Sequence, residues 1–250
     1  MRLLIVDGGN VVMRCAYGGE TAPAPAAQSA MSFISRAARF AQATHLAVAI
    51  DGQGETWRHR LSPAYKGTRT TDTQPWMDAL AAACDAAQWM GLQLSGWEAD
   101  DLVATLAVRQ RGAVTVYSGD SDLLPLMNDR VEILRPAPSG GFEVWDAAAV
   151  EARYGVAPGR LVELKALTGE SGDNIAGVPQ IGPKRAVQLL TLYGRLDAII
   201  AAGENQACRQ SIKVAAAQAA ARLAHQLITL HTAAPLPAIA PSLCRIQPKA

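Results

Sequence analysis

Leu3-Leu4-Ile5-Val6-Asp7 is the stretch that decides the fold, because two later stretches repeat its design. They are Leu46-Ala47-Val48-Ala49-Ile50-Asp51 and Val114-Thr115-Val116-Tyr117-Ser118-Gly119-Asp120. Each is a short apolar run that leads into a carboxylate, and such runs are typical of strands buried on both faces of a parallel sheet. Strands that alternate with helices predict an α/β, doubly wound architecture. Helical patterns separate the runs at 30–44, 75–90 and 99–111.

The chain becomes helical from residue 146 onward. Four prolines between 235 and 248 then predict an irregular tail over 232–250. We therefore expect an α/β core over 1–145, a helical lobe over 146–231, and the tail. The helices of the lobe are predicted at 146–154, 161–168, 183–193 and, as one helix or a pair, 208–231.

The composition excludes several classes of protein. Half of the 250 residues are hydrophobic and 18% are charged, which is typical of a globular chain and not of a disordered one. No run of 18 apolar residues could span a membrane, and the run at 3–6 meets Asp7 too early for a signal-peptide core. The four cysteines are far apart, which argues against a zinc cage or a disulfide framework and favours a reducing cytoplasm.

The net charge of +1 conceals an asymmetry along the chain. Residues 1–173 contain 20 of the 22 acids but 15 of the 23 bases, and no acid follows residue 204. A second acid-free stretch, 56–71, contains four bases. Basic zones beside an acidic body favour a polyanionic partner such as a nucleic acid, although solvated basic faces are also common.

Seven carboxylates are expected near one edge of the sheet. Ligands of parallel α/β sheets bind beyond the carboxyl ends of the strands, where three of these groups lie. Taken alone, each Asp is better explained as a turn former or a helix cap. Together they would repel one another unless hard cations such as Mg²⁺ or Mn²⁺ were bound, and two such ions about 4 Å apart are the usual device for phosphodiester hydrolysis. The seven are Asp7, Asp51, Glu98, Asp100, Asp101, Asp120 and Asp122.

A glycine-rich segment lies between two predicted helices at 177–185, with the sequence Gly-Val-Pro-Gln-Ile-Gly-Pro-Lys-Arg. Glycines allow the backbone to approach a phosphate closely, and the N-terminus of the following helix offers free N–H groups. Lys184 and Arg185 add positive charge. The segment indicates a sequence-independent grip on a phosphate backbone, or else an ordinary corner between two helices.

Together these segments resemble the bacterial and phage 5′-nuclease family, which includes the 5′→3′ exonuclease domain of DNA polymerase I and the flap endonucleases. The resemblance covers residues 1–193 and is weaker beyond. It rests on motifs in the family's order at 4–8, 49–51, 65–69, 97–101, 118–123 and 167–175.

The resemblance implies a PIN-like parallel-sheet nuclease core with a helical arch at about 52–95, a helix–hairpin–helix-type lobe and two divalent cations, Mg²⁺ or Mn²⁺. The first metal site would use Asp7, Asp51, Glu98, Asp100 and Asp101, with Asp120 and Asp122 between the sites. Glu170 and Asp173 would complete the second site. Lys66 and Arg69 would contact the scissile phosphate as catalytic residues. K⁺ would bind backbone carbonyls of the hairpin, and the DNA-binding residues would be Arg14, Arg58, Tyr65, Gly177, Val178, Gly182, Lys184 and Arg185.

Two positions depart from the family pattern. Glu170 replaces the usual Asp, and its extra methylene conflicts with the strict octahedral geometry of Mg²⁺. Gln180 replaces the first Gly of the hairpin's Gly-x-Gly. If that position needs a positive φ, Gln costs about 1 kcal/mol there.

The function expected from these features is metal-dependent hydrolysis of DNA at 5′ ends, 5′ flaps, overhangs or single-strand/double-strand junctions, in DNA replication and repair. A functional link to a DNA polymerase and a cytoplasmic location go with it. Two alternatives stay open: a catalytically weak protein that binds DNA junctions, and a PIN-type ribonuclease. The glycine-rich hairpin and the Tyr65-Lys66 segment argue against the ribonuclease, because small PIN domains lack both.

Overall fold

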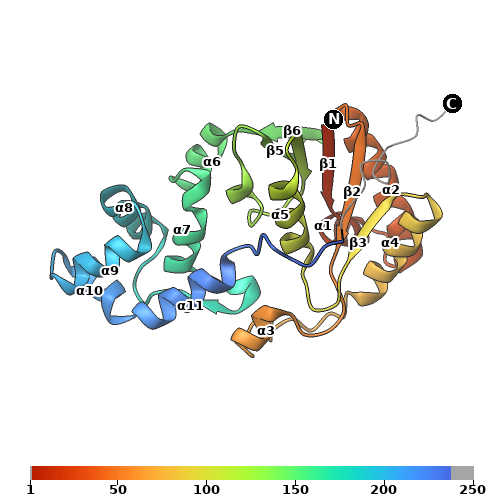
Figure 1. The fold of residues 1–250 in the computed structure, drawn as a ribbon. Helices are drawn as coiled ribbons and strands as arrows, with labels where there is room; N and C mark the ends of the chain where they lie inside the picture. Colours follow the sequence, from red (N-terminus) through yellow and green to blue (C-terminus); the bar gives the residue numbers. More distant parts are fainter. Residues whose placement is uncertain (1, 238–250) are drawn as a thin grey trace. The chain divides into compact units, whose positions relative to one another are not determined.

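The computed structural model describes residues 2–237, and its chain forms two compact units that each contain segments distant in sequence (Figure 1). Unit 1 consists of Met1–Trp57, Thr71–Asp146 and His231–Ala250, of which the last segment is described to residue 237. Unit 2 consists of Arg58–Thr70 and Ala147–Leu230.

Unit 1 is built on a six-stranded sheet in the order β3-β2-β1-β4-β5-β6. Only β6 is antiparallel to its neighbour. The three strands expected from the sequence are present as β1, β2 and β4. β1 lies between the other two, and its apolar run is buried from Leu3 onward. The bounds are β1 (Arg2–Asp7), β2 (His45–Ile50), β3 (Met90–Gln93), β4 (Ala113–Tyr117), β5 (Val131–Pro136) and β6 (Phe142–Trp145).

Helices cover both faces of this sheet. Leu4 and Val6 of β1 belong to a core cluster with side chains of α1, α2 and α4, while α5 contacts β1 and β2 and lies on the other side of the sheet in Figure 1. The alternation of side chains along β1 supplies both faces with apolar groups. The bounds are α1 (Gly8–Tyr17), α2 (Pro23–Phe40), α4 (Gln74–Ala86), α5 (Ala99–Arg109) and the short 3₁₀ helix η1 (Leu124–Leu126).

The segment expected to form an arch, 52–95, is divided between the two units. Met77, Leu80 and Cys84 of α4 are fully or almost fully buried, and their spacing places them on one helix face against α2. Residues 71–95 are therefore core structure, and only 58–70 belong to unit 2.

Unit 2 is helical apart from a two-stranded antiparallel sheet of β7 (Gly169–Glu170) and β8 (Ile175–Ala176). The predicted helices at 161–168 and 183–193 are confirmed as α7 and α8, and the 208–231 region is a pair of helices. The helix at 196–204 was not predicted. The bounds are α3 (Trp57–Leu61), α6 (Ala147–Tyr154), η2 (Pro158–Arg160), α7 (Leu161–Thr168), η3 (Ser171–Asp173), α8 (Pro183–Tyr193), α9 (Leu196–Glu204), α10 (Arg209–Ala216) and α11 (Gln218–Ile228).

The described part of the expected tail, 231–237, is held against α5 by hydrogen bonds; residues 238–250 lie outside the described chain. Thr105 Oγ1 donates to the His231 carbonyl at 3.2 Å and accepts from the Ala234 amide at 3.0 Å. Arg109 donates to the carbonyls of Ala234 and Leu236, both at 2.9 Å. Thr105 and Arg109 are four residues apart and so share one face of α5. This face binds the extended segment 231–237.

Thr105→Val should lower the free energy of unfolding by about 1–3 kcal/mol, because it leaves the buried Ala234 amide without its acceptor. Thermal unfolding measures the effect, and a chain of this size should lose roughly 2–4 °C in Tm per kcal/mol. Thr105→Ser keeps the hydroxyl and serves as the control. Equal Tm values for wild type and Thr105→Val would contradict the role of this hydroxyl.

Candidate functional site

Carboxylates of unit 1 gather at the carboxyl end of the sheet. Asp7 ends β1, Asp51 follows β2, and Asp120 and Asp122 follow β4. Asp7 pairs with Ala49 and Val6 with Tyr117, so the register aligns the three strand ends. Asp100, Asp120 and Asp122 each offer an oxygen, and these atoms lie within 4.8 Å of one another. Asp120 and Asp122 of this group come from the loop after β4, and Asp100 comes from the first turn of α5 (Ala99–Arg109).

Asp7 and Asp120 are connected through the hydroxyl of Ser118. Ser118 Oγ donates to Asp7 Oδ2 at 2.6 Å and accepts from the Asp120 amide at 2.9 Å. The other Asp7 oxygen accepts from the Asn10 amide at 3.0 Å and caps α1. Asp120 Oδ1 in turn accepts from the Asp122 amide at 2.9 Å. These bonds fix the orientation of the acidic side chains before any ion is bound.

The start of α5 is fixed by Asp51. Its Oδ1 accepts from the Ala99 amide at 2.7 Å, and the Gly52 amide donates to the Trp97 carbonyl at 2.9 Å. Glu98, at the N-cap of α5, is buried. The strand end of β2 therefore determines where the acidic first turn of α5, with Asp100, lies.

Burial and mutual repulsion change the acidity of this cluster. Burial raises the pKa of Asp7 from 3.8 to about 7, with smaller contributions from Asp51 and Asp120, against the lowering effect of the Ser118 and Asn10 hydrogen bonds. Burial, followed by the charges of Asp7, Asp120 and Asp122, also raises the pKa of Asp100 well above its usual value. Oxygen donors without His or Cys fit a hard divalent cation, whose charge would relieve this repulsion.

Asp101 was expected to be a metal ligand, but the structure gives its carboxylate other partners. The fully buried Asp101 accepts from Trp57 Nε1 at 2.9 Å through Oδ2 and from the His231 amide at 2.8 Å through Oδ1. The His231 ring packs edge-on against Trp97, with centroids 4.8 Å apart. Because both oxygens already accept from protein donors, we assign Asp101 to holding Trp57 and the C-terminal segment within unit 1.

Unit 2 brings together Tyr65, Lys66, Arg69 and Asp173. Asp173 accepts from the Tyr65 hydroxyl at 3.0 Å and pairs with Arg69 at 2.5 Å, and its carbonyl accepts from the Lys66 amide at 2.9 Å. Lys66 has a positive φ of 53°, and its Nζ lies 5.1 Å from the Tyr65 ring centroid. Segment 64–69 is thereby attached to η3.

Besides Arg69 and Asp173, three expected site residues of unit 2 are buried or ion-paired within the protein. Tyr65, expected to bind DNA, is 3% exposed and cannot present its ring to a ligand. Arg58, also 3% exposed, donates to the Leu227 carbonyl at 2.7 Å, which corrects its assignment to DNA binding: a buried guanidinium satisfies the carbonyls at the end of α11. Glu170 pairs with Lys165 at 2.9 Å.

The glycine-rich hairpin at 177–185 divides into a packed part and an open part. A Cβ on Gly177 would lie 2.5 Å from the Gly169 nitrogen, so this glycine allows β7 and β8 to approach, and Val178 is buried. Gly182 has open space where a Cβ would be, and it begins α8 as the N-cap. Gly182, Lys184 and Arg185 are exposed, so this end is available to an anion.

Gln180 occupies the hairpin position at which a positive φ would make glutamine less favourable than glycine. Its φ is +66°, in the left-handed region, so the condition for a cost of about 1 kcal/mol relative to glycine is met. Its carbonyl accepts from Arg185 Nη1 at 2.8 Å.

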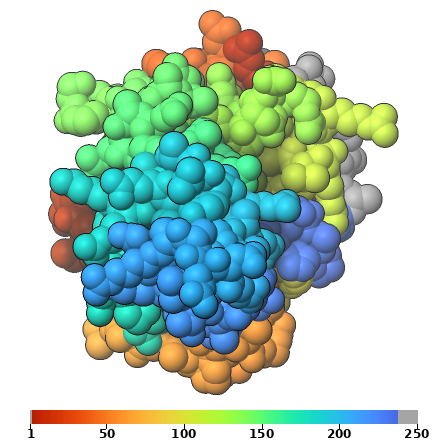
Figure 2. Space-filling view, turned by 90° about the vertical axis from the view of Figure 1, so that its left-hand side faces the viewer, coloured from red at the N-terminus to blue at the C-terminus, as the bar shows by residue number. Residues whose placement is uncertain are grey.

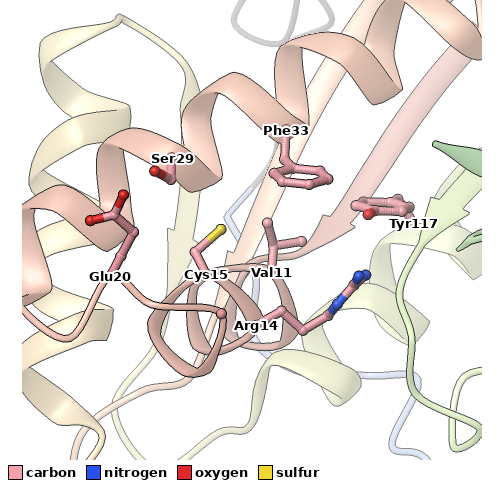
Figure 3. A pocket seen from close by; sticks show the side chains of 8 residues that line it. Val11, Arg14, Cys15, Glu20, Ser29, Phe33 and Tyr117 are labelled. Atoms are coloured by element: carbon pink, nitrogen blue, oxygen red, sulfur yellow. The ribbon is translucent and has the colours of Figure 1, made fainter. Parts of the chain in front are cut away.

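Arg14 lies on the exposed side of α1 and lines a cavity of about 280 Å³ in unit 1 (Figure 3). Phe33, Tyr117 and Cys15 form its apolar wall, with Glu20 at the other end from Tyr117. Burial raises the pKa of the Tyr117 hydroxyl, which the neighbouring Arg14 opposes. The Arg14 guanidinium therefore lies beside Tyr117, the last residue of β4.

Comparison with known proteins identifies the family. Residues 2–155 match the 5′-3′ exonuclease N-terminal resolvase-like domain, and residues 156–250 match the 5′-3′ exonuclease C-terminal SAM fold. The chain belongs to the 5′-3′ exonuclease family. The resemblance found in the sequence is therefore confirmed.

Relatives in this family include flap endonuclease Xni of Aeromonas salmonicida, 37% identical over 94% of this chain and 92% of that protein. Flap endonuclease Xni of Shewanella baltica is 31% identical over 94% of this chain and 91% of that protein. DNA polymerase I of Rhizobium leguminosarum is 36% identical over 77% of this chain, which spans 19% of the polymerase. A structure of T5 5′-exonuclease with bound zinc has a TM-score of 0.78 at 24% identity and covers 93% of this chain and 90% of that one, which confirms the α/β fold.

Within this 5′-3′ exonuclease chain, sequence reasoning missed two groups that orient the acidic cluster. Ser118 stands inside the recognised motif at 118–123 but was not given a role of its own. The Asn10 side chain accepts from the Gly119 amide at 2.9 Å and so connects α1 to the loop after β4. Its signal was its position three residues after Asp7, which becomes informative only once α1 is known to begin at Gly8.

The metal-free protein should become less stable as the pH rises from about 4 to about 7. Carboxyl groups with raised native pKa values, such as Asp7 at about 7, bind more protons folded than unfolded in this window, so stability falls with pH. Asp100→Asn should flatten the dependence and raise Tm at pH 8 in EDTA, and a divalent cation should restore the wild type. A Tm that rises over this range in EDTA would contradict the proposed repulsion.

Proposed function

We propose that the protein is a metal-dependent 5′→3′ exonuclease and flap endonuclease that hydrolyses DNA at 5′ ends, 5′ flaps, overhangs and single-strand/double-strand junctions. The observation that carries the proposal is the oriented cluster of Asp100, Asp120 and Asp122, whose mutual repulsion a bound cation would relieve. Relatives named flap endonuclease Xni, whose alignments cover 94% of this chain, support the substrate class.

The residues of unit 1 would act on the ion and on its geometry. Asp100, Asp120 and Asp122 would hold a divalent cation, Mg²⁺ or Mn²⁺, with Asp7, Asp51 and Glu98 as further oxygen donors. When bound, such an ion polarises the phosphate and lowers the pKa of a coordinated water. Ser118 would keep Asp7 in one orientation, so that the donors lose little freedom when the ion arrives.

Unit 2 would contribute the contacts with phosphate. Lys66 and Arg69 remain our candidates for offsetting charge on the reacting phosphate, with Asp173 fixing the segment that carries them. Lys184, Arg185 and the open Gly182 would hold the duplex backbone, and K⁺ on hairpin carbonyls belongs to the same proposal.

The setting of this activity is part of the proposal. The match to one region of a DNA polymerase I supports a functional link to a polymerase in replication and repair. The cysteines within the described residues are free thiols, which supports a cytoplasmic location; they are Cys15, Cys84 and Cys208. No helix in the part of the chain that the structure describes is both long and apolar enough to cross a membrane.

A catalytically weak protein that binds DNA junctions is the second candidate. It is favoured by the ion pairs of unit 2, because Glu170 pairs with Lys165 and Asp173 with Arg69. A carboxylate neutralised by a neighbouring base attracts a cation less strongly than a free one. Binding and cleavage of the same flap, measured side by side, separate the two candidates.

Asp120→Asn should abolish cleavage and leave DNA binding intact, because it removes one charged donor from the cluster without changing its shape. The assay incubates a 5′-labelled flap with Mg²⁺, Mn²⁺ or EDTA and reads product lengths on a gel. The same flap in RNA tests the ribonuclease alternative. Tight flap binding without cleavage by the wild type in either metal would support the second candidate, and wild-type turnover by Asp120→Asn would refute the metal assignment.

Lys66→Met should lower the single-turnover rate by roughly 10²–10³, the usual loss for one charge-stabilising donor, with a smaller change in affinity. Arg60→Met is the matched control, since Arg60 is an exposed base in the same acid-free stretch. Rates within a few-fold of wild type for Lys66→Met would place Lys66 outside the reaction.

A further inference from the structure

Gln180 has a second partner besides Arg185. Its side-chain Oε1 accepts a hydrogen bond from Lys213 Nζ, which belongs to α10. One residue of the hairpin thus contacts two cations, Arg185 through its carbonyl and Lys213 through its side chain. In the sequence, Arg185 follows Gln180 by 5 residues and Lys213 follows it by 33 residues.

The backbone of Gln180 makes this side-chain contact informative. Its φ of +66° favours glycine, so glutamine is the less favourable residue for the turn itself. Strained conformations persist where the surrounding structure or the function compensates for them. The feature that glutamine offers and glycine lacks is the amide, and that amide binds Lys213.

The position of Lys213 is fixed by the packing of α10. A Cβ on Gly203 of α9 would lie 2.0 Å from the Ser211 carbonyl oxygen, so the backbones of α9 and α10 are in direct contact. Ser211 and Val214 are fully buried on either side of Lys213. Lys213 therefore projects from a rigid helix, and its hydrogen bond to Gln180 selects one of its conformations.

The surroundings of this contact are basic. Lys184, Arg185 and Gln180 are exposed, and no acid follows residue 204 in the sequence. The acids of α9 have partners of their own, because Asp197 pairs with Arg222 and Glu204 accepts from Gln218. In Figure 2 the cyan and blue atoms of the chain from α8 to α10 lie next to one another on the face toward the viewer.

We propose that Gln180 is a positioning residue that holds Lys213 beside the hairpin, so that α10 contributes a phosphate contact to the duplex-binding surface. The surface consists of Gly182, Lys184, Arg185 and Lys213, and the ligand is the sugar–phosphate backbone of a nucleic acid duplex. The inference rests on the proposed function of the hairpin and extends it to α10. Arg185 donates to the Gln180 carbonyl and Lys213 to its side-chain oxygen, so one residue orients both bases that would face the phosphate backbone.

The test measures duplex DNA affinity at several salt concentrations for Lys213→Met, Gln180→Gly and the double variant. Lys213→Met should reduce the log–log salt slope by about one and weaken binding roughly five- to tenfold near 0.1 M salt, as expected for one lost phosphate contact. Gln180→Gly keeps the charge of Lys213 but should weaken binding several-fold while raising Tm. The double variant should bind no more weakly than Lys213→Met.

Arg222→Met is the matched control. It also removes a base from this acid-poor region, but the charge of Arg222 is already neutralised by Asp197. It should leave the salt slope unchanged. A double variant, Lys184→Ala with Arg185→Ala, tests the hairpin separately. If it has a reduced salt slope while Lys213→Met keeps wild-type affinity and slope, the role of Lys213 is overturned and the hairpin assignment stands. An unchanged slope in both would refute duplex binding by the hairpin as well. Wild-type affinity in Gln180→Gly beside weak binding in Lys213→Met would overturn the positioning role.

Discussion

Repulsion among buried carboxylates at the carboxyl end of the sheet is the constraint on which the site depends. A parallel register brings the ends of β1, β2 and β4 level, and each end supplies an acid. Hydrogen bonds from Ser118, Asn10 and Ala99 hold these acids in place, which prevents the cluster from relaxing by moving apart. The fold thus stores unfavourable electrostatic energy where a cation would remove it, as is common at functional sites.

The carboxylates of the two units have different electrostatic surroundings. In unit 1, Asp7 and Asp100 remain close to other acids and respond by raised pKa values. In unit 2, Asp173 and Glu170 have bases beside them, and Asp173 serves as the anchor of the segment that contains Lys66 and Arg69. The acidic cluster of unit 1 is therefore the place where the free energy of metal binding would be largest, and unit 2 presents mainly positive charge.

Sequence reasoning was most successful where local chemistry and fold agree. Continuous apolar runs located β1, β2 and β4, and helix-breaking residues at the ends located α7 and α8 closely. It failed for β3 and β6, four-residue strands whose sequences carry no pattern of their own, and for α9, which follows Gly194 after one residue. The resemblance supplied the acidic positions, but it could not show that Asp101 binds Trp57 and His231 or that Arg58 is buried, because those partners lie 44 to 169 residues away. The positive φ of Gln180 was a conditional expectation, and the structure fulfils the condition.

We expect bound cations to replace protons in the cluster around Asp7 and Asp100. Calorimetric titration with Mg²⁺ or Mn²⁺ in buffers of different ionisation enthalpy counts the protons released on binding. Release of roughly one proton at pH 6.5 should shrink by pH 8.5, where Asp7, with its pKa of about 7, is already ionised, and Asp100→Asn should reduce it at the lower pH. Cation binding without proton release at pH 6.5 would contradict the account.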